Sequence, residues 1–85
     1  MNDLRITEAT YLDSYRLKLM FIDGKMQIVD FKDFLSTAKH PEIRKYLDLE
    51  LFKNFHISYG DLCWGDMDLT FPIWDLYLGK VGKSK

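Results

Sequence analysis

The chain has 85 residues, of which 47% are hydrophobic and 15% aromatic, and its formal net charge is −1. This length corresponds to one small domain, and the apolar content with the low net charge excludes a disordered chain. No run of about 18 apolar residues occurs, so a membrane-spanning helix is not expected. The single cysteine, Cys63, excludes an internal disulfide framework. Because no signal-peptide pattern is visible, we expect a cytoplasmic location.

Charge is unevenly distributed along the sequence. Residues 54–78 contain no Lys or Arg. The acidic residues of this stretch are Asp61, Asp66, Asp68 and Asp75. Basic residues return at Lys80, Lys83 and Lys85. We therefore expect a single α+β domain over residues 1–78, acidic in balance, followed by a flexible basic tail over residues 79–85.

The first third of the chain predicts a three-stranded meander. A first strand is expected over residues 4–10. Tyr15, Leu17, Leu19 and Phe21 then share one face, and the other face carries Arg16 and Lys18, followed by Met20 and Ile22. This alternation has the period of a strand. The following Asp-Gly pair at residues 23–24 predicts a two-residue type I′ turn that leads into a third strand over residues 26–29.

The middle of the chain has helical spacing. Phe31, Phe34 and Leu35 recur as on one helix face, and Asp30 can serve as the N-cap. Pro41 suits the first position of a second helix, because a proline there loses no helical hydrogen bond. Residues 48–51 fit either a helix or a strand.

The last third predicts a hairpin and a short helix. Phe55, Ile57 and Tyr59 alternate with polar residues, and Gly60-Asp61 fits a type II′ turn before a returning strand that carries Trp64. A proline at residue 72 then opens a short helix. The expected fold class is α+β, with a small antiparallel sheet of about five strands (the meander plus the C-terminal hairpin) and two or three short helices. The expected order is β-β-β-α-(α)-β-β-α. The aromatic residues assigned to the core are Tyr15, Phe21, Phe31, Phe34, Phe55 and Tyr59.

No pattern in the sequence predicts a catalytic, cofactor-binding or metal site. Gly82-Lys83-Ser84 resembles the end of a phosphate-binding loop, but the required earlier glycine is replaced by Tyr77. His40 and His56 lack partners at zinc-ligand spacing. The acidic loop residues Asp66 and Asp68 fit a turn whose side chains bond backbone amides, and a hard-cation site is the less favoured alternative.

Aromatic residues are concentrated near the acidic, cation-free stretch. They are Trp64, Phe71, Trp74 and Tyr77. These residues either complete the core and the helix packing or form an exposed patch that binds a partner. An acidic aromatic patch favours a basic protein over nucleic acid, since stacking of single strands normally comes with Lys or Arg.

Five short motifs, in order and spacing, resemble a known family. They are Tyr15-x-Leu17-x-Leu19-x-Phe21-x-Asp23-Gly24, Val29-Asp30-Phe31, Phe52-x-x-Phe55, Trp64-Gly65-Asp66-x-Asp68-Leu69 and Leu76-Tyr77. The run is similar to domain-of-unknown-function family 2442, small bacterial proteins of this length. The resemblance implies a small α+β domain and a regulatory or binding module, similar to partners encoded beside small toxin-like proteins. Residues 70–73 depart from the family pattern by being more apolar.

These observations favour a non-enzymatic protein-interaction or regulatory module without cofactors or a membrane association. We expect its partner-binding residues to be Asp66, Asp68, Trp74 and Tyr77. The expected partner is a protein, such as a basic toxin-like protein, or a second copy that joins through a sheet edge. The alternative is a nucleic-acid-associated transcriptional regulator that uses the basic C-terminal tail.

Overall fold

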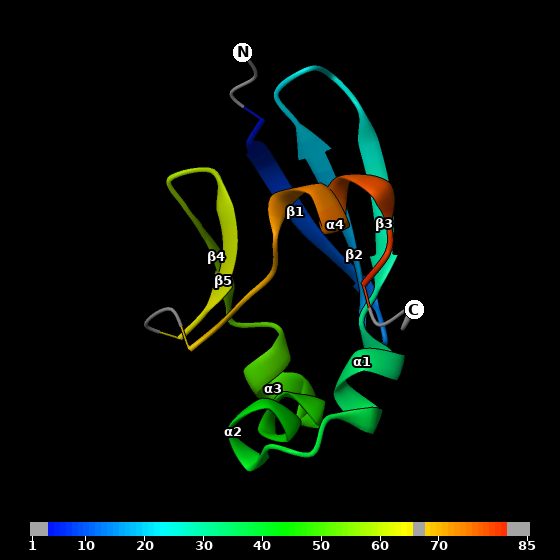
Figure 1. Ribbon diagram of the computed structural model, residues 1–85, viewed down its shortest axis with the longest axis vertical. Helices are drawn as coiled ribbons and strands as arrows, with labels where there is room; N and C mark the ends of the chain where they lie inside the picture. The colour runs from blue at the N-terminus through cyan, green and yellow to red at the C-terminus, as the bar shows by residue number, and fades with distance from the viewer. Residues whose placement is uncertain (1–3, 66–67, 82–85) are drawn as a thin grey trace.

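The computed structural model describes residues 4–65 and 68–81 and shows an α+β domain with two three-stranded antiparallel sheets (Figure 1). The first sheet has the order β1-β2-β3 and the second the order β4-β5-β6. The helices α1 to α3 gather at one end of the molecule, whereas α4 crosses in front of β2 and β3 (Figure 1). The predicted class is confirmed, but the prediction of one five-stranded sheet is wrong.

The first sheet is built from β1 (Ile6–Asp13), β2 (Arg16–Phe21) and β3 (Met26–Asp30). Leu17, Leu19 and Phe21 of β2 are buried, which confirms the predicted alternation. Such a strand has one face on the core and one in solvent because successive side chains point to opposite faces.

The β2–β3 hairpin forms where it was predicted, but its turn is of another type. Gly24 N donates to Phe21 O at 2.9 Å and Phe21 N donates to Lys25 O at 2.8 Å, so three residues form the loop. Gly24 has a positive φ of 94°, and Asp23 is not among the described residues with positive φ. A type I′ turn needs positive φ at both central residues, so the loop is a three-residue turn completed by glycine.

Short helices α1 (Lys32–Thr37), α2 (Pro41–Arg44) and α3 (Leu49–Phe52) follow, with a 3₁₀ turn η1 (Lys45–Leu47) between α2 and α3. Side chains before each helix satisfy its free amide groups. His40 accepts from Glu42 N at 3.2 Å, and Asp48 accepts from Glu50 N at 3.0 Å. The cap of α1 is Phe31, while Asp30 accepts from Lys32 N. The ambiguous residues 48–51 therefore belong to a capped helix.

The second sheet consists of β4 (Phe55–Ser58), β5 (Asp61–Trp64) and β6 (Leu69–Thr70), and α4 spans Ile73–Leu78. The two-residue strand β6 was not predicted. It pairs with β5 through Trp64 and Leu69.

The β4–β5 turn corrects one residue of the predicted core. Ser58 pairs with Asp61, so Tyr59 and Gly60 form the turn, with φ values of 52° and 84°. Two positive φ values indicate a type I′ turn instead of the expected type II′ turn at Gly60-Asp61. Because the turn comes one residue early, Tyr59 lies at its tip and is fully exposed, at 102%.

The core lies between the two sheets and is centred on Trp64. Its side chain is 0% exposed, and its Nε1 donates to Phe52 O at 2.7 Å. Ring centroids from 5.5 to 6.4 Å away surround it, and they belong to Phe31, Tyr46, Phe52, Phe55 and Phe71. Phe71 is also buried. Two of the four aromatic residues of the acidic stretch are therefore core residues.

The packed part of the chain extends beyond α4. Gly79 ends α4 in a left-handed conformation, and Val81 is buried in the core cluster. The domain thus includes Val81, three residues past the boundary predicted at residue 78. Of the predicted tail lysines, Lys80 is exposed, and Lys83 and Lys85 lie outside the described residues.

Candidate functional site

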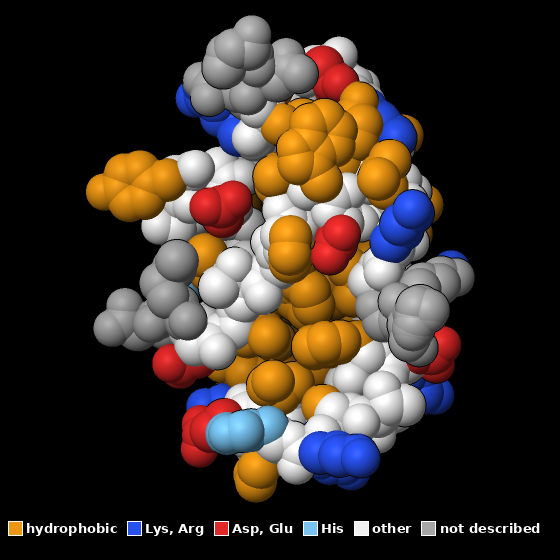
Figure 2. Space-filling model, viewed as in Figure 1, with side chains coloured by type: hydrophobic (Ala, Val, Ile, Leu, Met, Phe, Trp, Pro, Cys, Tyr) orange, Lys and Arg blue, Asp and Glu red, His pale blue; other side chains and the backbone are white. Residues whose placement is uncertain are grey.

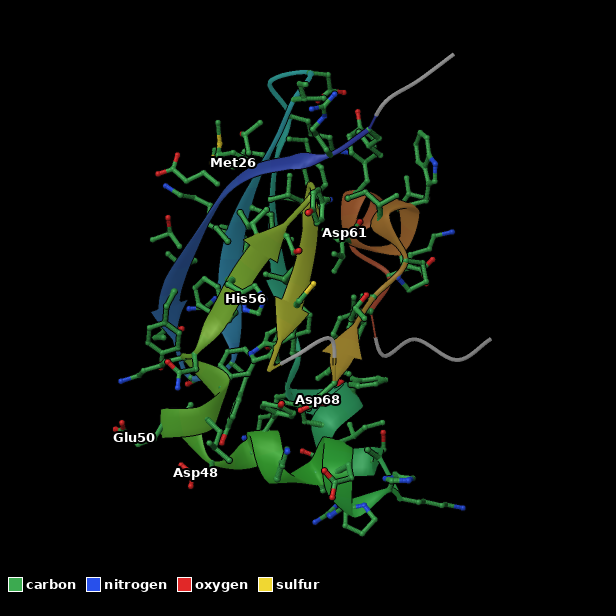
Figure 3. The ribbon with its side chains drawn as sticks, turned by 90° about the vertical axis from the view of Figure 1, so that its left-hand side faces the viewer. Met26, Asp48, Glu50, His56, Asp61 and Asp68 are labelled. Atoms are coloured by element: carbon green, nitrogen blue, oxygen red, sulfur yellow. The ribbon has the colours of Figure 1, made fainter. Side chains whose placement is uncertain are left out.

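The four predicted partner-binding residues do not form one site. Trp74 and Tyr77 lie together on α4, with ring centroids 5.3 Å apart. Asp68 lies near the helical end of the molecule, away from α4 (Figure 3). Asp66 lies outside the described residues. The described candidates therefore lie in two separate places, the surface of α4 and the surroundings of Asp68.

Helix α4 carries an exposed apolar ridge. Leu76 is buried and holds the helix on the core, whereas Trp74 and Leu78 are each 49% exposed. Residues four apart in a helix are neighbours on its surface, so these two side chains are adjacent. We call Trp74, Tyr77 and Leu78 the α4 ridge. Figure 2 shows hydrophobic side chains gathered over α4 and the adjoining end of the β2–β3 hairpin.

Tyr77 connects the α4 ridge to the β2–β3 hairpin. Its ring packs edge-on against Phe21 with centroids 5.0 Å apart, and its hydroxyl donates to Asp23 Oδ2 at 2.5 Å. Lys25 Nζ lies 4.2 Å from the centre of the same ring. Three different contacts with one hairpin fix Tyr77, so the neighbouring Trp74 projects from a supported position.

The Asp23–Tyr77 hydrogen bond shifts both pKa values. The hydroxyl of Tyr77 lowers the pKa of Asp23, with a further contribution from the Lys25 amide. The carboxylate of Asp23 raises the pKa of Tyr77. Both shifts stabilise the pair in which Asp23 is ionised and Tyr77 protonated.

Charge around the α4 ridge is mixed and not uniformly acidic. Asp23 is bonded to Tyr77, and Lys25 places a positive charge against the Tyr77 ring. Asp75 is exposed, and its carboxylate has no ion pair or side-chain hydrogen bond with the described residues. Within residues 4–65 and 68–81, the acidic group next to Trp74 that has no such partner is therefore Asp75.

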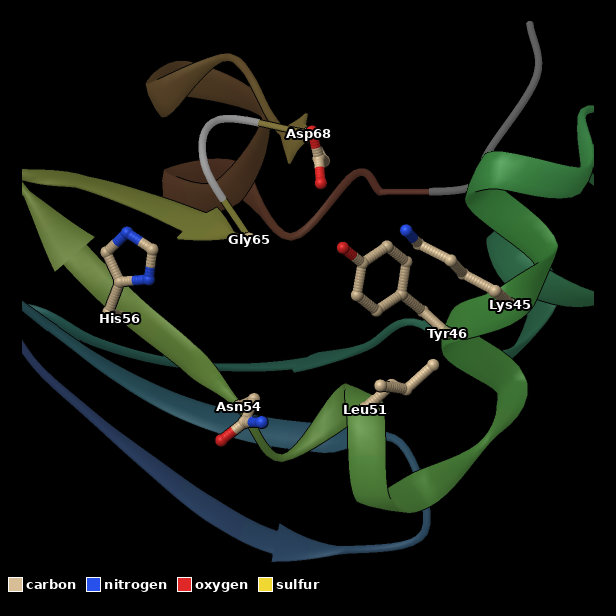
Figure 4. Close-up of a pocket in the computed structure, with 7 residues that line it drawn as sticks. All are labelled: Lys45, Tyr46, Leu51, Asn54, His56, Gly65 and Asp68. Carbon is tan, nitrogen blue, oxygen red and sulfur yellow. The ribbon is translucent and has the colours of Figure 1, made fainter.

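Asp68 lines an open pocket of about 320 Å³ between η1, α3 and the second sheet (Figure 4). Figure 4 shows Asp68, Lys45 and Tyr46 directed toward one another. Its lining residues are Lys45, Tyr46, Leu51, Asn54, His56, Gly65 and Asp68. Gly65 allows Asp68 and Tyr46 to approach the backbone closely. A Cβ at this position would lie 2.5 Å from Asp68 Oδ2 and 3.2 Å from the Tyr46 hydroxyl oxygen.

The pocket combines opposite charges with neutral hydrogen-bonding groups. Lys45 Nζ lies 3.3 Å from Glu42 Oε1, and this hydrogen bond raises the pKa of Lys45, with a smaller contribution from Asp68. Tyr46 is buried, and its hydroxyl makes no hydrogen bond within the described ranges. Such a mixture can hold a small polar molecule. No group of three or more His, Cys, Asp or Glu residues that could bind a metal gathers in the described chain.

Asp68 does not cap the last helix, α4. The N-cap of α4 is Pro72, which makes no side-chain cap hydrogen bond. The Asp68 amide donates to Trp64 O at 3.0 Å and so closes the turn that leads into β6. The position of Asp68 is therefore set by a backbone turn, and its carboxylate is available to the pocket.

The sequence patterns did not predict several residues of the α4 ridge and of the pocket. Leu78 was missed as a surface residue, although it stands four residues after Trp74 in the predicted helix. Lys45 and Tyr46 were missed at the pocket, since no short-range pattern connects them with Asp68. His56 is exposed, as its place between Phe55 and Ile57 predicted. Cys63 is fully buried, and burial raises the pKa of its thiol.

Comparison with known proteins identifies the family. Residues 6–82 match the family model described as "Protein of unknown function (DUF2442)". Because the match covers nearly the whole chain, the chain belongs to this family. No curated protein and no solved structure matches it. Among the described residues, no helix has the length and apolar character needed to cross a membrane.

Proposed function

We propose that this member of the family is a non-enzymatic protein-interaction module that binds a basic protein partner through the α4 ridge. The observation that carries the proposal is the exposure of Trp74 and Leu78 side by side on a helix that the core already holds. Tryptophan is among the residues most enriched at the energetic centres of protein interfaces.

The position of Trp74 reduces the cost of binding. Its neighbour Tyr77 is fixed by Phe21, Asp23 and Lys25 of the β2–β3 hairpin. A surface that is ordered before it meets its partner loses less conformational freedom on binding. This support favours a recognition surface over an aromatic side chain left in solvent by chance.

Asp75 indicates the chemistry of the partner. Its carboxylate has no partner among the described residues and lies next to Trp74 in the sequence, whereas the nearby Asp23 accepts a hydrogen bond from Tyr77. The matching partner surface has an apolar side chain for the ridge and a Lys or Arg for Asp75. A small basic protein of the toxin-like kind implied by the resemblance has this chemistry.

The test compares proteins captured by four forms of the chain in cells of its natural host. The forms are the wild type, Trp74→Ala, Asp75→Lys and the control Leu12→Ser, which changes a residue exposed to 39% on β1. We expect one basic protein to be recovered with the wild type and the control and to be lost with both ridge variants. After purification, the captured protein should bind the wild-type chain with at least tenfold higher affinity than it binds the Trp74→Ala variant.

Two results would overturn this function. One is a set of captured proteins that is the same for all four forms. The other is salt-sensitive binding of DNA or RNA that disappears when Lys80, Lys83 and Lys85 are changed to Gln and is indifferent to Trp74→Ala. The second result would establish the alternative, nucleic-acid-associated role.

A further inference from the structure

Among the described residues, strand β3 is the open edge of the two sheets. Among the other outer strands, β1 is irregular and partly occupied. Its pairing with β2 has two register shifts, and Ile6 N donates a hydrogen bond to Gly60 O at 2.8 Å. Strand β4 lies next to β1, and β6 has only two residues. In contrast, β3 pairs with β2 over five residues without a register shift. It also lacks the lysine, proline or bulge that usually protects an exposed edge.

The backbone of β3 has unpaired groups that point outward. Phe21 N donates to Lys25 O, and Phe31 N donates to Tyr15 O, both at 2.8 Å. In an antiparallel pair, residues that exchange backbone hydrogen bonds alternate with residues that do not. The backbone N–H and C=O groups of the odd-numbered residues of β3 therefore point toward β2. The backbone groups of Met26, Ile28 and Asp30 therefore face away from the sheet. Within the described chain they have no backbone partner across that edge.

Met26 and Ile28, together with Met20 of β2, form an apolar strip on the uncovered face of the first sheet, which we call the β3 strip. Met26 is 53% exposed and Ile28 51% exposed, and Met20 lies opposite Met26 on β2. Figure 3 shows Met26 on the side of the first sheet that faces away from the second sheet, where no helix or strand covers it. Exposed apolar side chains beside unpaired backbone are the two elements of a strand-addition site.

We propose that β3 pairs with β3 of a second copy of this chain, antiparallel and centred on Gln27, to form a continuous six-stranded sheet. In this register Met26 lies opposite the partner's Ile28, and the reciprocal pair repeats the contact. The strip then runs without interruption from Met20 through Met26 to the partner's Ile28. A two-fold interface of this kind needs a surface that is complementary to itself.

Charge supports this occupant and this register. In the register centred on Gln27, Lys25 faces the partner's Val29 and Asp30 faces the partner's Gly24, so no like charges are opposed. The neighbouring register, centred on Ile28, would place Met26 opposite the partner's Asp30. Side chains directly opposite in a sheet contribute most to its stability, so the first register is favoured.

The proposed register can be tested with charged side chains at positions 26 and 28, because it places these two positions opposite each other in the dimer. We expect the wild type to show a concentration-dependent monomer–dimer equilibrium in sedimentation velocity between about 10 μM and 1 mM, the weak range expected for a small interface. Met26→Lys with Ile28→Lys opposes four positive charges and should shift the midpoint at least tenfold toward monomer. Met26→Lys with Ile28→Glu opposes Lys to Glu at both pairs and should retain the dimer. Leu12→Lys on β1 is the control for surface charge.

Three outcomes would overturn the proposal. They are a wild type that is monomeric throughout this range, a dimer unaffected by the double lysine variant, and a dimer lost equally in the Lys–Glu variant. The last would indicate self-pairing of Ile28 or a nonspecific loss. Far-UV circular dichroism of each variant separates these results from unfolding, since both positions are exposed. A dimer lost only on Trp74→Ala would place self-association at the α4 ridge instead.

Discussion

Trp64 and Trp74, ten positions apart in the chain, have opposite environments. Trp64 is 0% exposed and its indole is bonded to the carbonyl of Phe52, whereas Trp74 is 49% exposed. Both lie in the acidic stretch where the sequence left core and surface roles open. Alternation places Trp64 on the inner face of its strand, but it does not say how many aromatic rings the core needs. Burial of Phe71 and exposure of Trp74 follow from tertiary packing, which local spacing does not contain.

Removing the indole nitrogen tests the role of Trp64. In Trp64→Phe the buried carbonyl of Phe52 loses the donor that lies 2.7 Å away. We expect the free energy of unfolding to fall by about 2 kcal/mol, the usual cost of leaving a buried polar group unpaired. The measurement is urea denaturation. Trp74→Phe is the matched control and should change stability by less than about 0.5 kcal/mol; equal effects of the two substitutions would contradict the assignment.

The Asp23–Tyr77 hydrogen bond predicts a pH dependence with two limits. The pKa of Asp23 is lowered in the folded state, so its stabilising contribution is present above the unfolded pKa of about 4 and is lost as pH falls through the folded value. The pKa of Tyr77 is raised, so its contribution is present below about pH 10 and is lost as pH rises through the folded value.

Tyr77→Phe removes both contributions at once. We expect the urea midpoint of the wild type to exceed that of Tyr77→Phe at pH 7 and the difference to shrink at pH 3 and at pH 11. Comparing the two midpoints over this pH series provides the measurement. A difference that stays constant with pH would show that the hydroxyl acts through packing alone.

At the scale of elements, strands with strong alternation were predictable and turn chemistry was not. The alternation of β2 and the Asp-Gly pair located the β2–β3 hairpin, but its turn takes three residues instead of two. In the second hairpin the turn begins at Tyr59, which no propensity favours at positive φ. This shift of one residue takes Tyr59 out of the strand and into the turn, where its side chain is fully exposed instead of buried in the predicted core.

Strand β6 and the division into two sheets were beyond prediction for a related reason. A two-residue strand has no period to detect, and its pairing with β5 depends on the turn that Asp68 closes. The two sheets are connected at the Ile6–Gly60 hydrogen bond, which joins residues far apart in the sequence. Local patterns predict strands, but they do not predict which strands share a sheet.

Gly60 tests the junction between the sheets. A Cβ there would lie 2.4 Å from Arg5 Cβ, which cannot move without its backbone, whereas nothing lies within 4 Å of a Cβ on Gly24. Both residues have positive φ, so alanine strains both backbones by about 1–2 kcal/mol. We expect Gly60→Ala to cost about 1–3 kcal/mol more than Gly24→Ala, because the clash displaces the start of β1. Thermal unfolding of both variants gives the comparison, and equal losses would contradict a close contact at this junction.

At the scale of the whole molecule, two surfaces with different chemistry lie on different sides of the first sheet. Helix α4, which carries the ridge, covers one face of the first sheet. The β3 strip of Met20, Met26 and Ile28 lies on the opposite face, which no helix of the described residues covers. A dimer formed through β3 therefore leaves Trp74 of each copy accessible. The molecule would then present two ridges to its partner, which raises the avidity for a partner with two sites.

The candidate site was predictable only in part. Trp74 and Tyr77 were selected because aromatic residues stood in a stretch without Lys or Arg, and both lie on the ridge. Asp68 was selected from the same stretch, yet it lies in a separate pocket with Lys45 and Tyr46 from the helical end of the chain. Spatial grouping of this kind depends on how the helices pack against the second sheet.

We propose the α4 ridge as the surface at which a protein partner binds, and cross-linking in cells tests this most directly. The most direct measurement places a photo-reactive side chain at position 74, and in a second form at position 12, and identifies the products formed in cells of the natural host. We expect position 74 to cross-link to one basic protein, position 12 to give no such product, and Asp75→Lys to abolish the product at position 74. Cross-links of equal yield from both positions, or none from position 74, would contradict the proposal.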